Sequence, residues 1–273
     1  MAVMRAGDID HDENIFVSDY NRWAAGFGTS SGYLVTDLDM DRNAFVSDYN
    51  KWAANFGSTT NVGAGGCAFV DNRDGHVYKC ITIGSQTWMA ENLAWLPSVS
   101  PPTAASDTDP YYYVVGYEGS TVSAAKATAN FGIYGVLYNW PAAMTDCPSG
   151  WHLPTDEEWK VLEKNQGMSI SEADADGWRY SSTVGGRLKE SGMAHWSGPN
   201  TGATNTSGFT ALAGGYRYGG VFSNFGNYTY FWSASESGSL YAWDRFLNNL
   251  TDGVGRDFSN RNDGFSVRCI QNN

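Results

Sequence analysis

The sequence predicts an α+β protein: a small all-α module over residues 1–57, a linker over residues 58–66 and a larger sheet-containing domain over residues 67–273. Three observations lead to this prediction. A 21-residue phrase occurs twice near the N-terminus, and each copy ends in a short helical pattern. A Gly-, Ser- and Thr-rich stretch follows it and is typical of a linker. Beyond that stretch, Gly and aromatic residues are frequent and helix-length periodic segments are rare, as in a sheet with long loops.

The repeated phrase has the ligand spacing of a calcium loop. The copies begin at Asp8 and Asp37, and 15 of 21 positions are identical. Each has Asp at positions 1, 3, 5 and 12 of a twelve-residue loop, and the residue at position 7 supplies a backbone carbonyl, as calcium loops do. The expected Ca²⁺ ligands are Asp8, Asp10, Asp12, Asn14 and Asp19 in the first copy and Asp37, Asp39, Asp41, Asn43 and Asp48 in the second. Acidic helix caps without metal are the alternative interpretation.

A helix follows each loop. Val17, Tyr20, Ala24 and Phe27 recur at helical spacing, and Gly28 ends the pattern. One such unit cannot bury its apolar face alone, whereas two can bury theirs against each other. Asp at position 12 and the loop–helix order resemble the dockerin type I repeat, although position 6 lacks the usual Gly. The resemblance implies folding on calcium and a cohesin-like partner protein.

The second domain begins with a hairpin signal and later contains a helix start. Asp74-Gly75 lies between two runs of strand-forming residues, a pattern typical of a tight turn. Thr155 followed by Glu158 three residues later predicts a capping box at the start of a short helix. Trp159 and Leu162 are expected on the buried side of that helix.

Seven phrases, in order, carry a family resemblance over residues 67–271: "IGSQTWMAENL", "YNWPAAM", "CPSGWHLPTDEEWKVL", "GFTALAGGYR", "FWSASE", "AWDRFL" and "GFSVRC". Together they resemble the Fibrobacter-type major paralogous domain. The resemblance implies a C-type-lectin-like fold with a small twisted antiparallel sheet, two helices and long loops. The "LPTDEEW" phrase is also similar to formylglycine-generating-enzyme-like domains.

The four cysteines have no C-x-x-C spacing, which favours two disulfides in an exported protein over a zinc site. Reduced buried thiols in a cytosolic protein are the alternative. Cys67 and Cys80 lie almost symmetrically about the predicted hairpin turn, so a bridge between them is plausible. The family resemblance implies the second pair, Cys147–Cys269.

The net charge of −12 excludes nucleic acid and anionic membranes as expected partners. No apolar run reaches the roughly 18 residues of a membrane span, and the N-terminal residues do not form a signal peptide. An extracellular or cell-surface location is expected.

Two C-terminal segments predict a ligand-binding face. Residues 214–231 contain seven Tyr or Phe and five Gly, and residues 244–263 contain four Asn, four Asp and three Arg. Such residues on irregular backbone are typical of a paratope, although a Gly-rich loop surface is the alternative. The face is expected to contain Tyr216, Tyr218, Phe225, Tyr228, Tyr230, Asp244, Phe246, Asn248, Leu250, Asp252, Val254, Asp257, Ser259 and Arg261.

Both segments also lack Lys, Glu, Gln, Met and Trp. These are the residues that an AAY codon cannot reach when its two adenines are randomised. The segments therefore resemble the variable region of diversity-generating retroelement proteins, which ends in an invariant strand, here "GFSVRC". Trp232 and Trp243 lie between and beside the segments and are expected to anchor the core.

The chain is expected not to be an enzyme. None of the four histidines has an evident catalytic partner, and no nucleophile elbow, zinc-binding helix or phosphate loop is present. Two alternatives remain: a formylglycine-generating-type enzyme, which needs a reactive thiol, and a carbohydrate-binding module of a polysaccharide-degrading assembly. The ligand of the predicted face is accordingly an unknown protein or carbohydrate.

Overall fold

The computed structural model describes residues 67–272. The chain divides into two units, Met1–Ala68 and Phe69–Asn273, and the statements below concern the described residues. The predicted calcium ligands Asp8 to Asp48, the predicted module over residues 1–57 and the linker over residues 58–66 all lie outside them.

Short strands dominate the described residues. The strands are β1 (Cys67–Val70), β2 (Val77–Ile83), β3 (Gln86–Met89), β4 (Tyr112–Tyr113), β5 (Leu137–Tyr138), β6 (Trp151–His152), β7 (Gly177–Arg179), β8 (Tyr216–Tyr218), β9 (Val221–Ser223), β10 (Tyr228–Glu236), β11 (Tyr241–Asn248), β12 (Val254–Asn260) and β13 (Ile270–Gln271). The helices are α3 (Val122–Lys126), α4 (Ala129–Tyr134), α5 (Trp140–Thr145), α6 (Asp156–Asn165), α7 (Ile170–Ala173) and α8 (Val184–Leu188).

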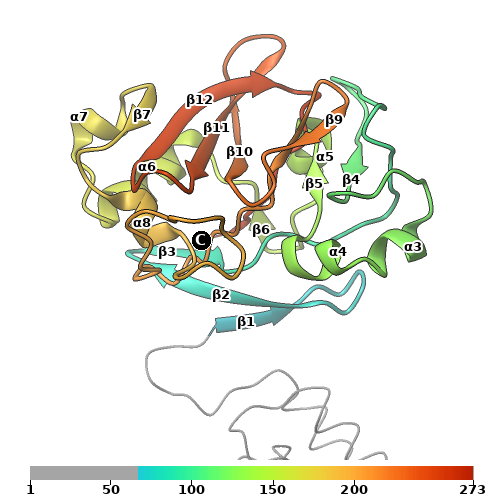
Figure 1. Ribbon diagram of the computed structural model, residues 1–273, viewed down its shortest axis with the longest axis horizontal. Helices are drawn as coiled ribbons and strands as arrows, with labels where there is room; N and C mark the ends of the chain where they lie inside the picture. Colours follow the sequence, from blue (N-terminus) through green and yellow to red (C-terminus); the bar gives the residue numbers. More distant parts are fainter. Residues whose placement is uncertain (1–66, 273) are drawn as a thin grey trace, which may run out of the picture. The chain divides into compact units, whose positions relative to one another are not determined.

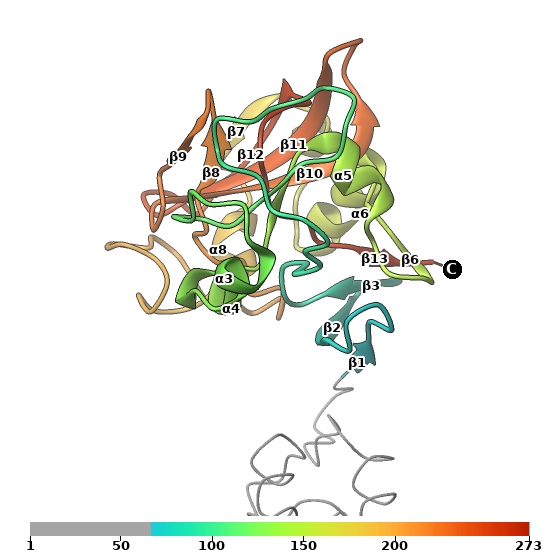
Figure 2. The ribbon, with the colours of Figure 1, turned by 90° about the vertical axis from the view of Figure 1, so that its right-hand side faces the viewer.

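The strands form two main sheets and two small ones. One sheet has the order β1-β2-β3-β13-β6 and the other the order β10-β11-β12-β7, while β4-β5 and β8-β9 are two-stranded. Figures 1 and 2 show the two main sheets on opposite sides of the unit, with α6 between them. Because β13 pairs with both β3 and β6, the last strand of the chain lies inside the first sheet and connects β6 to it.

The predicted fold class is wrong. An α+β domain with two helices, preceded by an all-α module, was expected. The described residues instead form a mainly β structure in which the longest helix, α6, has 10 residues. No all-α module lies within residues 67–272. Many of the strands are two to four residues long, too short to leave a period-2 pattern in the sequence.

Aromatic side chains join the two sheets through α6. Trp159 on α6 packs against Trp88 of β3 at 4.8 Å and against Phe231 of β10 at 5.8 Å between ring centroids. The predicted capping box is confirmed, because the Thr155 hydroxyl accepts the Glu158 amide and the Glu158 carboxylate accepts the Thr155 amide. Trp159 and Leu162 are both buried, as expected.

The hairpin and one predicted disulfide are also present. The Asp71 carbonyl accepts the Gly75 amide at 2.8 Å, and Gly75 adopts a φ of +77° that favours glycine. Cys147 and Cys269 form a disulfide across a sequence separation of 122 residues. Cys67 and Cys80 are also disulfide-bonded.

The "GFSVRC" segment differs from its prediction. A strand with one buried side was expected, but Phe265, Ser266, Val267, Arg268 and Cys269 are all buried. The Arg268 guanidinium is fixed there because it donates to the carbonyls of Met89, Phe209 and Thr210. The segment therefore runs through the interior, and the side chains on both sides of its backbone are buried.

Candidate functional site

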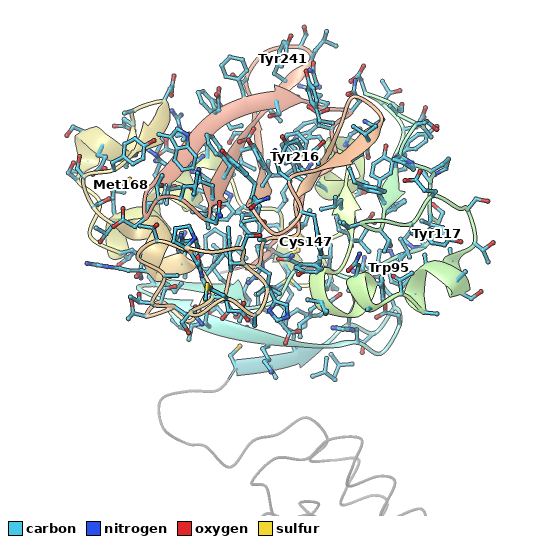
Figure 3. All side chains as sticks on the ribbon, viewed as in Figure 1. Trp95, Tyr117, Cys147, Met168, Tyr216 and Tyr241 are labelled. Carbon is cyan, nitrogen blue, oxygen red and sulfur yellow. A yellow bond between two sulfur atoms is a disulfide. The ribbon has the colours of Figure 1, made fainter. Side chains whose placement is uncertain are left out.

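An aromatic groove lies beside the four-stranded sheet. It has a volume of about 280 Å³. Four chain segments line it: the β8 strand, β10, the paired ends of β11 and β12, and the segment after β12. The lining residues are Tyr216, Tyr218, Tyr230, Tyr241, Phe258, Ser259, Asn260, Asp263 and Phe265. Figure 3 labels two of them, Tyr216 and Tyr241.

The β8–β9 hairpin holds one wall of this groove. Gly219 and Gly220 have φ values of +57° and +87°, so a two-residue turn connects the strands and places Tyr218 opposite Val221. The backbone of Arg217 fixes the hairpin to the chain end. Its amide donates to the Gly264 carbonyl, and its carbonyl accepts the Gly264 amide, both at 2.8 Å. Tyr216 and Tyr218 are consequently held by backbone pairing on both sides.

Two pairs of rings in the groove pack edge to face, while Tyr230 and Phe265 are inclined at only 33° with centroids 4.8 Å apart. Tyr216 meets Tyr230 with centroids 4.8 Å apart at 68°, and Tyr241 meets Phe258 at 5.6 Å and 74°. Phe265 forms the floor and is 2% exposed, whereas Tyr218 at the rim is 58% exposed. The groove therefore combines a rigid aromatic floor with an open rim.

Strand register continues this surface beneath the groove. Tyr230 pairs with Phe246, and Asp244 pairs with Asp257, so these side chains share one face of the sheet. The Phe246 ring lies over Gly255, where an added Cβ would come within 2.1 Å of it. Glycine at that position is what allows Phe246 to lie flat between β10 and β12.

Two buried carboxylates stand next to the groove. Asp244 is fully buried, and its Oδ2 accepts the Ser259 hydroxyl at 2.7 Å. Its Oδ1 is buried with no hydrogen-bond partner in the described part of the chain. Burial, opposed by the Ser259 hydrogen bond and helped by the nearby Asp257 carboxylate, raises the pKa of Asp244 to about 7. Burial likewise raises the pKa of Asp263 to about 6.

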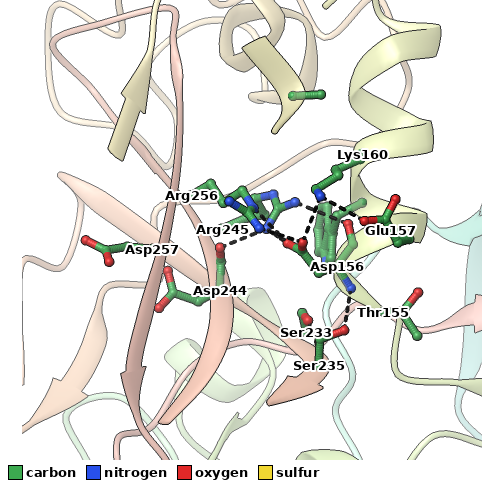
Figure 4. A network of polar contacts seen from close by, with 12 residues as sticks. Thr155, Asp156, Glu157, Lys160, Ser233, Ser235, Asp244, Arg245, Arg256 and Asp257 are labelled. Atoms are coloured by element: carbon green, nitrogen blue, oxygen red, sulfur yellow. Dashed lines mark hydrogen bonds and ion pairs between the residues drawn. The ribbon is translucent and has the colours of Figure 1, made fainter. Parts of the chain in front are cut away.

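An ion-pair network occupies the opposite face of the same strands. The Asp156 carboxylate accepts bonds from Arg245 and Arg256, each at 2.8 Å, and Glu163 accepts bonds from Arg179 at 2.6 Å and Arg245 at 2.7 Å. Burial opposes ionisation of Asp156, but the two guanidinium groups outweigh it and lower its pKa. Figure 4 shows this network on one side of β11 and β12 and the Asp244 and Asp257 side chains on the other.

The sequence-predicted ligand residues are only partly brought together. Tyr216, Tyr218, Tyr230 and Ser259 line the groove. Tyr228 stacks on Tyr230 at 6.3 Å, and Asp257 shares the face through its pairing with Asp244. The remaining predicted residues are buried or lie elsewhere.

Four residues that were expected in the ligand-binding face are buried. Asp244, Phe246 and Asn248 lie on the same face of the sheet as Tyr230, and the Tyr230 ring stacks on Phe246 at 5.1 Å. Val254 is 1% exposed and belongs to the main core cluster. Asn248 and Val254 lie in paired strands, whereas β7 pairs only with Val254–Arg256 and leaves Asp257 and Ser259 on an edge part of β12.

Four more predicted residues lie away from the groove. Phe225 packs on Tyr134 at 5.0 Å. Leu250 and Asp252 lie in the β11–β12 turn, and Leu250 is 62% exposed. Arg261 stacks over Trp140 at 4.4 Å and pairs with Glu236 at 2.9 Å.

Sequence reasoning missed five lining residues: Tyr241, Phe258, Asn260, Asp263 and Phe265. Tyr241 and Asn260 are cross-strand partners, whereas the predicted residue Ser259 pairs with Ala242. Asp263 lies in the predicted variable segment but was not expected at the face, and Phe265 was assigned to the invariant strand "GFSVRC". They reach the groove because the chain end passes directly beneath it.

The comparisons with known proteins give one family. No curated protein and no solved structure matches the chain. None of the helices in residues 67–272 is long and apolar enough to cross a membrane. The model of the Fibrobacter succinogenes major domain matches residues 81–271, which is more than half of the 273 residues. The predicted family resemblance is thus confirmed: the chain belongs to the Fibrobacter succinogenes major domain family.

Proposed function

We propose that the chain is a ligand-binding domain of a surface or extracellular protein and that it binds a protein ligand in the aromatic groove. Family membership suggests a surface or extracellular protein. The observation that carries the proposal is the lining itself: six Tyr or Phe side chains with Ser259, Asn260 and Asp263 between them. Tyr supplies large contact area at low entropic cost, and short polar residues adapt their hydrogen bonds to a partner.

Ring geometry favours a protein ligand over a carbohydrate. A sugar-binding platform needs exposed, coplanar rings. Here Tyr216 and Tyr230 are inclined at 68°, and Tyr241 and Phe258 at 74°. The inclined rings form a walled groove, which suits an inserted side chain better than a flat pyranose.

A binding role is also favoured over catalysis. A formylglycine-generating-type reaction needs a reactive thiol, and all four cysteines are disulfide-bonded. His195 has a partner that the sequence did not reveal, Glu190 at 2.8 Å, and His152 bonds Glu158 at 2.9 Å within the capping box. Neither histidine lies in the groove lining.

Diversification of the groove is part of the proposal. The two segments that lack Lys, Glu, Gln, Met and Trp supply seven of the nine lining residues, Tyr216, Tyr218, Tyr230, Phe258, Ser259, Asn260 and Asp263. Adenine-directed mutation of their codons would change the rim while leaving the buried floor at Phe265 intact. A near-copy of the 3′ coding region beside a reverse-transcriptase gene, differing only at adenines, is the expected genomic observation. Its absence would contradict diversification without contradicting binding.

The N-terminal repeat is proposed to bind calcium and to attach or space the groove domain. This part of the proposal rests on the repeated Asp spacing alone. Attachment would use a cohesin-like partner, in line with the dockerin resemblance.

The groove is tested with a partner captured from surface-exposed proteins and then purified. A Tyr218→Ala/Tyr241→Ala double variant is expected to lose at least about tenfold in affinity by calorimetry, as interface aromatics do. The matched control is Ile170→Ala, which removes an apolar side chain that is 73% exposed and lies outside the groove. Equal affinities for the wild type and the double variant would contradict the proposed site.

A further inference from the structure

Three carboxylates surround the groove without a positive partner. Asp263 lines it, and Asp244 and Asp257 are paired on the adjacent face of the sheet. Within residues 67–272, no Lys, Arg or His nitrogen lies within 4.0 Å of any of these three carboxylates. The local field at the groove is therefore negative, in a protein whose net charge is −12.

The nearest guanidinium groups are committed elsewhere. Arg217 is 3% exposed and donates to the carbonyls of Pro102, Ala104 and Asn262. Arg245 points to the opposite face, where Asp156 and Glu163 hold it. Neither can move to the groove without giving up buried hydrogen bonds, which is costly.

Asp244 is incompletely satisfied. Its Oδ1 is buried and unpartnered in the described residues, whereas its Oδ2 accepts the hydroxyl of Ser259, a groove residue. Figure 4 shows the side chain on the same side of the sheet as Asp257. Buried acceptors without a donor are rare in native proteins. Because Asp244 is fully buried and does not line the groove, a ligand in the groove would donate to the Asp263 carboxylate, which does line it.

Aromatic rings complete a cation-binding environment. Tyr216, Tyr230 and Phe265 have centroids within 4.8–6.4 Å of one another, and Tyr241 and Phe258 form a second pair of rings in the lining. Ring faces attract cations, and the attraction increases when water is excluded. A primary ammonium satisfies both demands, since it can lie against a ring and still donate hydrogen bonds to carboxylates.

We infer that the groove binds a primary ammonium group, presented by a lysine side chain of the protein ligand. The inference rests on the proposed function and specifies which side chain the groove takes. A quaternary ammonium would satisfy the rings but could not donate to Asp263, which lines the groove. A guanidinium is a wide planar fork that fits a carboxylate pair better than a walled groove.

The test is a titration of the ¹⁵N-labelled full chain with Nα-acetyl-lysine methylamide, followed by amide shifts. The norleucine analogue is the neutral control, because it has the same aliphatic stem without the charge. The lysine probe is expected to shift groove amides and to bind at least about fivefold tighter than the norleucine probe, as one cation–π contact with a charge partner allows. Equal shifts with both probes would overturn the ammonium inference and leave the groove as a binding site. No groove shift with either probe would overturn both proposals.

Variants locate the charge effect. Asp257→Asn changes an exposed residue, and Asp263→Asn preserves the shape of a buried one, so each tests the carboxylates by a different route. Both are expected to reduce the preference for the lysine probe over the norleucine probe. Glu118→Gln removes the same charge from an exposed position outside the groove and should leave that preference unchanged. Glucosamine carries the same ammonium on a sugar ring, and shifts equal to those of the lysine probe would overturn the assignment to lysine.

Discussion

Within residues 67–272, the clearest pH dependence of stability is expected from a single residue, Asp244. Its folded-state pKa is raised to about 7, first by burial and then by the Asp257 carboxylate, while the Ser259 hydrogen bond lowers it. The folded protein therefore holds a proton on Asp244 that the unfolded chain releases above about pH 4. The stability contributed by this protonation is fully present below about pH 4 and is lost as the pH rises through about 7.

Asp244→Asn tests this linkage. The amide keeps the shape and the Ser259 contact but removes the buried charge, so it should raise the free energy of unfolding by about 1–3 kcal/mol near pH 8. Below about pH 3 the variant and the wild type should have about the same stability, because Asp244 is then neutral in both the folded and the unfolded state. Urea unfolding at the two pH values measures the difference.

Glu118→Gln is the control for this experiment, since Glu118 is exposed and is not among the charges that shift the pKa of Asp244. A stabilisation by Asp244→Asn that is as large at the acidic pH as at the alkaline one would contradict the linkage. It would instead indicate that the amide gains a hydrogen bond that the carboxyl lacks.

At the residue scale, the sequence indicates which residues share a side of the sheet better than it indicates whether their side chains are buried. Composition brought Asp244, Phe246 and Asn248 into the expected face, and they do lie on one side of β11, because side chains in a strand point alternately to the two sides. Composition gave no sign that all three are buried. Burial depends on segments that are distant in sequence, and a polar residue such as Asp244 gives no local sign of it.

Among the elements, helix α6 is held by a capping box at its first turn and by ion pairs to the distant strands β11 and β12. The capping box was predictable, since both of its members lie within four residues. The ion pairs were not, because Asp156 and Arg256 are separated by 100 residues and Glu163 and Arg245 by 82. Charged residues at a helix start usually remain in solvent, and nothing in the sequence distinguishes Asp156 from Glu157.

Arg245→Met is expected to destabilise the protein by about 3–5 kcal/mol, because it leaves buried carboxylates without one of their partners. Glu163 is fully buried and would keep only Arg179. Lys79→Met is the matched control. It pairs with Glu91 at 3.9 Å, and the two side chains are 69% and 35% exposed, so the Glu91 charge returns to water and the expected cost is about 1 kcal/mol or less. Similar losses for the two variants, measured by urea unfolding, would contradict the structural role of the network.

The two tryptophans of β10 and β11, Trp232 and Trp243, differ in burial. Both were expected to anchor the core. Trp232 is fully buried, packs on Phe265 at 4.3 Å and donates to the Tyr138 carbonyl. Trp243 is only half-buried and lies under the Arg256 guanidinium at 3.7 Å.

Trp232→Ala should therefore cost about 3–5 kcal/mol, as large core truncations do. Trp243→Ala should cost about 1–2 kcal/mol, because it removes one partly desolvated cation–π contact and little core volume. Thermal and urea unfolding give both values. A larger loss of stability for Trp243→Ala than for Trp232→Ala would mean that packing on the ion-pair face of the sheet stabilises the protein more than packing between the sheets.

For the molecule as a whole, the family was predictable and the fold class was not. Seven phrases in order identified the family, since each combines rare residues at fixed spacing. The fold class depends on how two- to four-residue strands assemble, and such strands are specified mainly by pairing with distant segments. The order β1-β2-β3-β13-β6 joins strands from both ends of the described residues, which no local pattern encodes.

The last prediction concerns calcium and the two units of the chain. Residues 8–57 carry eight Asp carboxylates in two loops, and their mutual repulsion favours unfolding unless a cation compensates it. The unit Phe69–Asn273 has its own aromatic core and the Cys147–Cys269 disulfide, none of which involves those carboxylates. EDTA should therefore change the amide spectrum of residues 8–57, excess Ca²⁺ should restore it, and the signals of residues 69–272 should stay in place throughout. Asp8→Asn/Asp37→Asn, which removes the first ligand of each loop, should reproduce the chelated spectrum without EDTA. An unchanged spectrum for residues 8–57 after chelation would mean that the repeated acidic phrase caps helices without binding metal, because only a bound cation makes that segment depend on the chelator.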